Sequence, residues 1–319
     1  MRLSPLLVPL VLCIASSATA APSFWDAVRD PSRARVERAL TQALRAREPR
    51  EIPPEALDLL SEEERAALAL RAVAILQEAG GEALNDPEVS FFLGDSLVLA
   101  DHGQDEEARR ILRRALAAQP DSPEAAHAWF QVGIASNRLR QFDAERAAYS
   151  SALRLQWDRN QRSTIYMNRG EAGMSLGLLK EARADYEAAL ALTDDSEIHA
   201  LSAWGLAVAL ARDEDLPDAL RRAWEASQFR FRDPEGNAVS ALELPGVFYT
   251  PDYEVYFYRA LGAMAAAEHA DKAEERKTEL EWAVSQWQRY LAEARPAGDR
   301  WTSNVEFHLT WCQRRLGKR

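Results

Sequence analysis

The sequence is poor in cysteine, with only Cys13 and Cys312 among 319 residues. Two cysteines exclude the class of small domains that several disulfides hold together. Positive charge is also scarce, because 39 Lys and Arg residues stand against 50 Asp and Glu residues, for a net charge of −11. An acidic chain lacks the clustered cations that displace counterions from phosphates. We therefore expect no nucleic-acid partner.

Motifs of catalysis and metal binding are missing as well. The five histidines have no zinc-ligand spacing, and there is no His-Glu-x-x-His, no Gly-x-Ser-x-Gly and no phosphate-binding glycine loop. Acidic pairs such as Asp194-Asp195 are interpreted as solvated helix faces. We predict no catalytic residue, no metal site and no cofactor.

Only one long apolar run occurs in the sequence, and it lies at the N-terminus. Residues 1–20 combine Arg2, the apolar stretch Leu6 to Ile14 and the ending Ala18-Thr19-Ala20, which is the pattern of a secretory signal peptide. The stretch is shorter than the roughly 17 residues of a membrane-spanning helix. We expect an exported protein, periplasmic or secreted, that does not span the membrane. Lipidation of Cys13 is not expected, because Val11-Leu12 precede it instead of small residues.

The strongest pattern that is present is an internal repeat. Tyr149 and Tyr186 are 37 residues apart and occupy corresponding places in the second half of two copies of the repeat. Small residues let two antiparallel helices approach closely, and aromatic side chains fill the space beside them. A fixed period of this length predicts stacked helix pairs. The five copies share a glycine in their first segment: Gly94, Gly133, Gly170, Gly205 and Gly262.

This pattern resembles the tetratricopeptide repeat family over residues 86–296. The resemblance implies an all-α solenoid of stacked antiparallel helix pairs that acts as a non-catalytic protein-interaction scaffold, here of the exported bacterial type. One long loop or small hairpin is inserted. Two departures stand out, since Glu145 occupies the place of an alanine and Arg169 replaces the leucine before glycine.

The domain order follows from the repeats and from what lies outside them. A solenoid needs its two ends covered, so flanking helices are predicted to be caps. An N-terminal helix lying in the groove as an inhibitor is the alternative. The predicted order is a signal peptide at 1–20, N-terminal capping helices at 21–85, four repeats at 86–227, an insertion at 228–257, a fifth, divergent repeat at 258–297 and a C-terminal capping helix at 298–319.

The insertion lengthens the spacing from Gly205 to Gly262 to 57 residues. Its start alternates aromatic and basic residues like a strand, a turn cluster follows at 233–237, and residues 239–249 are able to pair back. Two interpretations remain open: a loop that packs on the neighbouring repeat, or a binding element. The predicted insertion contacts are Phe229, Phe231, Phe248 and Tyr249.

In proteins similar to this one, the first helix of each pair lines a concave groove that receives a peptide or another domain. On each first helix, one row of residues packs within the repeat. The row one position later, about 100° further round the helix, forms a mostly apolar surface suited to an amphipathic helix or an extended apolar peptide. Packing against adjacent helices is the alternative. The predicted groove residues are Phe91, Asp95, Phe130, Ile134, Asn137, Arg138, Met167, Glu171, Met174, Leu206 and Leu210.

Three other functions are alternatives to an apolar-peptide groove. Gripping a peptide carboxylate, a known mode of the family, is not predicted, because only Asn137 and Arg138 would serve. A glycan- or peptidoglycan-binding or processing protein would use the insertion and Trp157, Trp224 or Phe248 as stacking platforms. An enzyme would need converging ionisable groups in a cleft at 228–257. The sequence predicts no particular oligomeric state.

Overall fold

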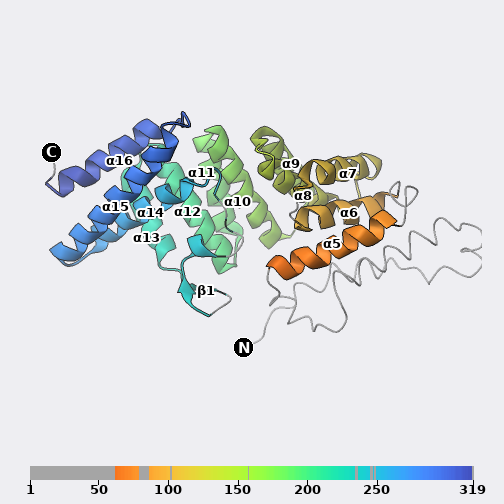
Figure 1. The fold of residues 1–319 in the computed structure, drawn as a ribbon, viewed down its shortest axis with the longest axis horizontal. Helices are drawn as coiled ribbons and strands as arrows, with labels where there is room; N and C mark the ends of the chain where they lie inside the picture. The colour runs from red at the N-terminus through yellow and green to blue at the C-terminus, as the bar shows by residue number, and fades with distance from the viewer. Residues whose placement is uncertain are drawn as a thin grey trace, which may run out of the picture. The chain divides into compact units, whose positions relative to one another are not determined.

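The computed structural model describes residues 62–78, 86–100, 103–156, 158–233, 236–244, 247 and 249–317. The predicted signal peptide, at 1–20, and the first part of the predicted N-terminal cap, at 21–61, lie outside these residues. The chain divides into two compact units, Met1–His102 and Gly103–Arg319. The division falls inside the first predicted repeat. The described residues form twelve α-helices and two short strands (Figure 1).

In the first unit, helix α5 (Glu62–Glu78) packs against helix α6 (Pro87–Ala100). Asp86 caps α6, because its Oδ1 accepts a hydrogen bond from the backbone N–H of Glu88 at 2.9 Å. Two predicted groove residues, Phe91 and Asp95, lie in α6 and are only 5% and 9% exposed. The prediction that these two residues lie on the groove surface is wrong, because both side chains are buried.

The second unit is a tetratricopeptide-like α-solenoid, as predicted. Each helix contacts the next along the chain, and first helices of successive pairs also meet, α10 with α12 and α12 with α14. Figure 1 shows the helices following one another in chain order. They are α7 (Asp105–Ala118), α8 (Ala125–Arg138), α9 (Phe142–Leu155), α10 (Arg159–Leu176), α11 (Leu179–Leu192), α12 (Ser196–Arg212), α13 (Leu216–Ser227), α14 (Glu254–His269), α15 (Ala273–Ala294) and α16 (Thr302–Arg315).

The repeated glycines make room for the repeated tyrosines. A Cβ atom at Gly133 of α8 would overlap the ring of Tyr149, and one at Gly205 of α12 would overlap the ring of Tyr186. The same Tyr186 ring lies 3.0 Å from the Cβ position of Gly170 in α10. Both tyrosines are almost fully buried, at 2% and 1% exposed. The predicted role of the glycines, close approach beside an aromatic ring, is confirmed.

The arginine that replaces a leucine in the third repeat has its own counter-charge. Arg169 Nε and Nη2 donate to the two carboxylate oxygens of Asp185 at 2.9 and 2.5 Å, and Asp185 is 4% exposed. Arg169 Nη1 also donates to Ser150 Oγ at 3.2 Å. This one side chain therefore joins α10 to α9 and α11, which explains why the repeat tolerates a charge here.

The insertion is a small hairpin followed by a short helical turn, which confirms the predicted kind of insertion. Strands β1 (Phe231–Arg232) and β2 (Ala238–Val239) are antiparallel, with Phe231 opposite Val239. Asp233 Oδ1 closes the turn by accepting from the Asn237 N–H at 2.7 Å. The 3₁₀ helix η2 (Ala241–Glu243) comes next. Helix α14 begins at Glu254, earlier than the predicted start of the fifth repeat at 258.

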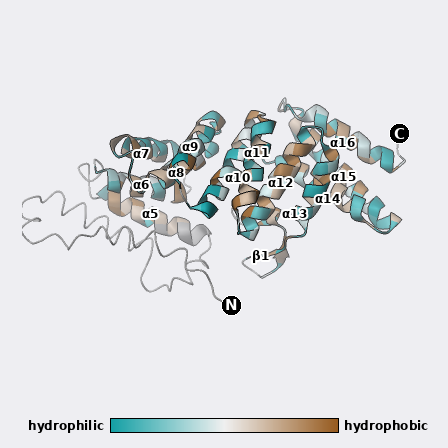
Figure 2. Ribbon diagram, turned by 180° about the vertical axis from the view of Figure 1, so that it is seen from behind, coloured by the Kyte–Doolittle hydropathy of each residue, from teal (hydrophilic) through white to brown (hydrophobic). Residues whose placement is uncertain are grey.

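The insertion returns over α12 and changes which residues are exposed. Helix η2 contacts α12, and Ala241 and Leu244 belong to the same buried cluster as Leu206 and Leu210 of α12. Figure 2 colours much of α12 as hydrophobic. The prediction that α12 offers a groove surface is therefore wrong. Four predicted groove residues are buried packing residues, with exposed fractions of 1% to 8%: Met167, Met174, Leu206 and Leu210.

Helix α16 covers the last repeat, at the position predicted for the C-terminal cap. Asn304 Nδ2 donates to the carbonyl oxygen of Ala211 at 3.0 Å, and His308 Nε2 lies 3.3 Å from the same oxygen. Burial lowers the pKa of His308 to about 4, so this histidine is neutral near pH 7. Cys312 is fully buried. No helix in the described part of the chain combines the length and the apolarity that a membrane crossing requires.

Candidate functional site: the groove of the second unit

Part of the predicted groove surface remains accessible, on α8 and α10. Phe130, Ile134 and Arg138 of α8 are half-buried, whereas Glu171 of α10 is exposed. We call these four residues the groove stripe. Asn137, beside them in sequence, is 8% exposed. The candidate site is therefore narrower and more polar than the sequence predicts.

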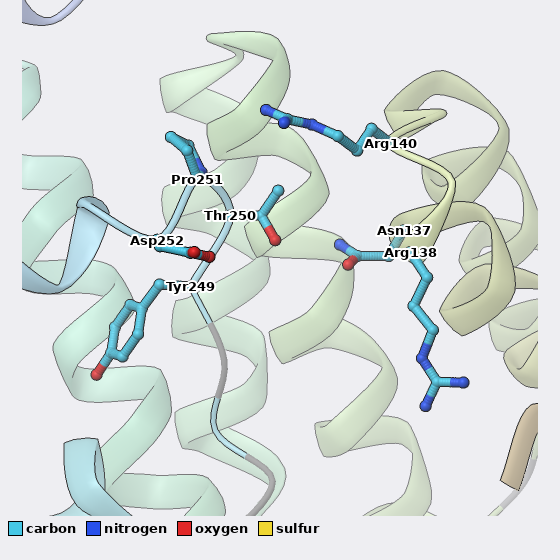
Figure 3. Close-up of a pocket in the computed structure, with 7 residues that line it drawn as sticks. All are labelled: Asn137, Arg138, Arg140, Tyr249, Thr250, Pro251 and Asp252. Atoms are coloured by element: carbon cyan, nitrogen blue, oxygen red, sulfur yellow. The ribbon is translucent and has the colours of Figure 1, made fainter. Parts of the chain in front are cut away.

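A cavity of about 410 Å³ adjoins this stripe. One wall comes from the end of α8 and the turn after it, and the opposite wall comes from the insertion, more than 100 residues later in the chain (Figure 3). Figure 3 shows the carboxylate of Asp252 and the side chain of Asn137 directed into the space between the walls. The lining residues are Asn137, Arg138, Arg140, Tyr249, Thr250, Pro251 and Asp252.

The predicted insertion contacts divide between packing and cavity wall. The half-buried ring of Phe229 lies 5.3 Å from the ring of His199, and Phe231 packs on the core. Tyr249 lines the cavity, but its ring turns away from the opening, lies 5.4 Å from the ring of Tyr258 and donates to Leu242 O at 3.0 Å. Phe248 lies outside the described residues. The described aromatic residues of the insertion therefore pack against the repeats, and its segment 249–252 forms one wall of the cavity.

Arg140 enters the cavity from a turn whose backbone favours glycine. Its φ is +56°, in the left-handed region, and Figure 3 shows its guanidinium extended toward Pro251. Arg140 was not among the predicted site residues, although it lies 37 residues from Gly103 and 37 residues from Gly177. The turns after four successive first helices carry a left-handed residue at this spacing: Gly103, Arg140, Gly177 and Glu214.

Glycine at the two charged turn positions is expected to stabilise the protein. A left-handed backbone costs a non-glycine residue about 1 kcal/mol, so Arg140→Gly and Glu214→Gly should each raise the free energy of unfolding by about that amount. Urea unfolding monitored by circular dichroism measures the change. Lower stability in both variants would show that the charged side chains hold the turns.

A buried amide–carboxyl pair includes Asn137, one of the residues that line the cavity. Asn137 Nδ2 donates to Glu145 Oε1 at 3.0 Å, and Glu145 is 1% exposed. Among the residues that the structure describes, Asn137 Oδ1 and Glu145 Oε2 find no hydrogen-bond partner. Burial raises the pKa of Glu145 to about 8; the hydrogen bond from Asn137 opposes the rise and the nearby Glu171 adds to it. The residue that replaces the repeat's alanine is thus a carboxyl group that favours its neutral form.

Glu145 predicts a pH-dependent stability. Its folded pKa of about 8 lies above the value of about 4.3 for an unfolded chain. The folded state therefore binds the proton more tightly, and its contribution is full below pH 4 and is lost as the pH rises through 8. Glu145→Gln should remove this part of the decline between pH 5 and 8. Parallel stability curves for the two proteins, measured by urea unfolding, would contradict the assignment.

Few features of the described residues support the alternative functions, glycan binding and catalysis. Trp224 stacks on His269 with ring centroids 4.2 Å apart, so one face of its ring is covered. Trp157 and Phe248, the other predicted stacking platforms, lie outside the described residues. Within the described ranges no three His, Cys, Asp or Glu side chains gather as metal ligands would.

Two segments match family models described as tetratricopeptide repeat, residues 87–132 and residues 163–196. The chain contains tetratricopeptide repeats. The matched segments include the first part of α8, with Phe130 of the groove stripe, and most of α10, with Glu171. No curated protein matches the chain.

Solved structures with a similar fold share little sequence. YrrB, titled a tetratricopeptide protein with an unusual peptide-binding site, is 15% identical with a TM-score of 0.42, covering 72% of this chain and 99% of its own. A Rap protein complexed with Competence and Sporulation Factor is 11% identical with a TM-score of 0.48, covering 89% and 76%. The quorum sensor NprR from B. thuringiensis is 11% identical with a TM-score of 0.48, covering 87% and 82%.

Proposed function

We propose that the protein is a non-catalytic interaction scaffold of the bacterial cell envelope that captures a segment of a partner protein in the groove of Gly103–Arg319. The observation that carries the proposal is the cavity of about 410 Å³ between the end of α8 and the insertion, next to the accessible groove stripe. A solenoid presents such a concave surface on a rigid frame, so a bound segment orders little of the protein.

The envelope setting is supported by the sequence of residues 1–20. A charged start, a short apolar run and a small-residue end direct export, and the partner would be another exported protein. Fractionation of cells that produce the full chain tests this part separately. Recovery of a shortened chain with the periplasmic or secreted proteins supports it, and recovery of the unprocessed chain with cytoplasmic proteins contradicts it.

Site-specific photocrosslinking tests capture in the groove. A photoreactive residue at Ile134 lies on the groove stripe, and one at Glu187, exposed on the second helix α11, is the matched control. In the source cell, Ile134 should give discrete adducts and Glu187 should not. Thr250→Trp, which fills the cavity from the insertion side, should remove the adducts. Equal adducts at both positions, or none at Ile134, would reject the proposal.

A further inference from the structure

We propose that the cavity beside the groove stripe binds the side-chain carboxylate of one Asp or Glu residue of the captured segment, and that Arg140 is the residue that holds it. This inference rests on the proposed function and adds the chemistry of its ligand. It departs from the apolar peptide that the sequence suggests, because most of the predicted apolar stripe is buried.

The guanidinium of Arg140 is a cation without a counter-charge. Within the part of the chain that the structure describes, it makes no ion pair and donates no hydrogen bond. The side chain is exposed and extends along the cavity (Figure 3). The second arginine of the cavity, Arg138, already pairs with Asp105 at 3.3 Å. A guanidinium binds a carboxylate through two parallel N–H donors, so Arg140 offers the cavity a ready site for one carboxylate.

The backbone of the turn fixes where this guanidinium begins. The Arg140 N–H donates to Asn137 O at 2.7 Å, and the Gln141 N–H donates to Ser136 O at 2.9 Å. Arg140 thereby takes a left-handed conformation, which two of the corresponding turns give to glycine. Arginine costs stability in this conformation, and no polar contact of its side chain with the described residues offsets the cost. A strained residue of this kind is a candidate for function.

The opposite wall of the cavity is held at both of its ends. Tyr249 Oη donates to Leu242 O at 3.0 Å, and Tyr253 Oη donates to Asp299 Oδ2 at 2.9 Å. The segment between these anchors, 250–252, faces the end of α8 across the cavity (Figure 3). Because both walls are fixed before a ligand arrives, little ordering is needed when the ligand binds.

Two acceptors in the same cavity suit the backbone of the bound residue. Asn137 is 8% exposed, and its Oδ1 has no hydrogen-bond partner among the described residues. The carboxylate of Asp252 is exposed and points into the space from the other wall (Figure 3). An unpaired buried oxygen favours a ligand that brings a donor. A peptide N–H beside the captured carboxylate would supply that donor, which a free anion lacks.

Charge elsewhere limits the ligand to a single acidic residue at this place. The chain has a net charge of −11, so most of its surface repels a run of acidic residues. Asp252 adds a negative charge on the wall opposite Arg140. The attraction for a carboxylate is therefore confined to the surroundings of Arg140, and salt should weaken it.

Selection from a phage-displayed library of random linear peptides on the full chain tests the inference. The peptides are joined to the coat protein through their C-termini, so a selected carboxylate belongs to a side chain. Enriched peptides should share one Asp or Glu, and replacing it with Asn or Gln should weaken binding about tenfold. Arg140→Gln should cause the same loss.

Arg140→Gly separates binding from folding. It should lose the same tenfold in affinity although it is expected to stabilise the protein, so a damaged fold would not explain the loss. Glu214→Gly is the matched control, because Glu214 occupies the corresponding left-handed turn position and does not line the cavity. This variant should bind the peptides like the wild type.

The outcomes also separate this inference from the proposed function. Enriched peptides without an acidic residue, or peptides that lose affinity in Thr250→Trp but not in Arg140→Gly, would overturn the carboxylate and leave the groove as a binding site. Equal losses in Arg140→Gly and Glu214→Gly would assign the effect to the turns and overturn it as well. Peptides that bind equally well to Thr250→Trp and Phe130→Glu, or a library without any enrichment, would overturn the proposed function and this inference together.

Discussion

Arg212→Met should lower the free energy of unfolding by about 3–5 kcal/mol, because it leaves a buried carboxylate without its partner. Arg212 is 7% exposed, and its Nη2 donates to both carboxylate oxygens of Glu254 at 2.7 and 2.6 Å. Its guanidinium lies 4.7 and 4.6 Å from the ring centroids of Phe257 and Trp301. Tyr290 Oη donates to Glu254 at 3.2 Å. The pair thus joins α12 to α14, to α15 and to Trp301, which directly precedes α16.

Arg183→Met is the matched control for this prediction. Arg183 Nη1 donates to Asp213 Oδ2 at 2.7 Å, but both side chains are about one-third exposed. Such a pair contributes up to about 1 kcal/mol. Urea unfolding should therefore separate the two variants clearly, and adding Glu254→Gln to Arg212→Met should restore part of the loss. Equal losses in the two arginine variants would contradict the burial argument.

Gly133→Ala should destabilise the protein by about 2–3 kcal/mol, although alanine is the better helix former by about 1 kcal/mol. The added methyl group would overlap the ring of Tyr149, which is 2% exposed and has little room to move. Thermal unfolding measures the effect. In a double-mutant cycle with Tyr149→Leu, the second substitution should relieve the overlap, so the two losses should not add. Additive losses, or a melting temperature equal to that of the wild type, would contradict the packing of α8 on α9.

The repeat could be predicted because its signal lies in short-range sequence patterns. Gly133 and Tyr149 belong to one helix pair, and the contact between them is repeated by Gly170 and Gly205 with Tyr186. A helix pair that buries small and aromatic residues at a fixed period leaves few other ways to fold. The solenoid therefore followed from the sequence.

The candidate site could be predicted only in part, because it depends on where a long insertion folds back. Leu206 and Leu210 have the spacing of surface residues on a first helix, but the insertion and α14 pack on α12 and bury them. The same fold brings Thr250 and Asp252 opposite Asn137 and forms the cavity. No local pattern in residues 228–257 specifies that return.

One further residue could not be predicted for a different reason. Arg140 lies 37 residues from Gly103 and from Gly177, but only the backbone shows that all three have a left-handed conformation in corresponding turns. An arginine is not a residue type that indicates such a turn.

Hydrogen–deuterium exchange of the full chain tests capture in the groove most directly, with and without a peptide selected on that chain from a phage-displayed library of random linear peptides. Binding should slow exchange in α8, in α10 and in the 249–252 segment, and should leave the second helices α9 and α11 unchanged. Slower exchange confined to α9 and α11, or to α15 and α16, would place the ligand elsewhere and contradict the account.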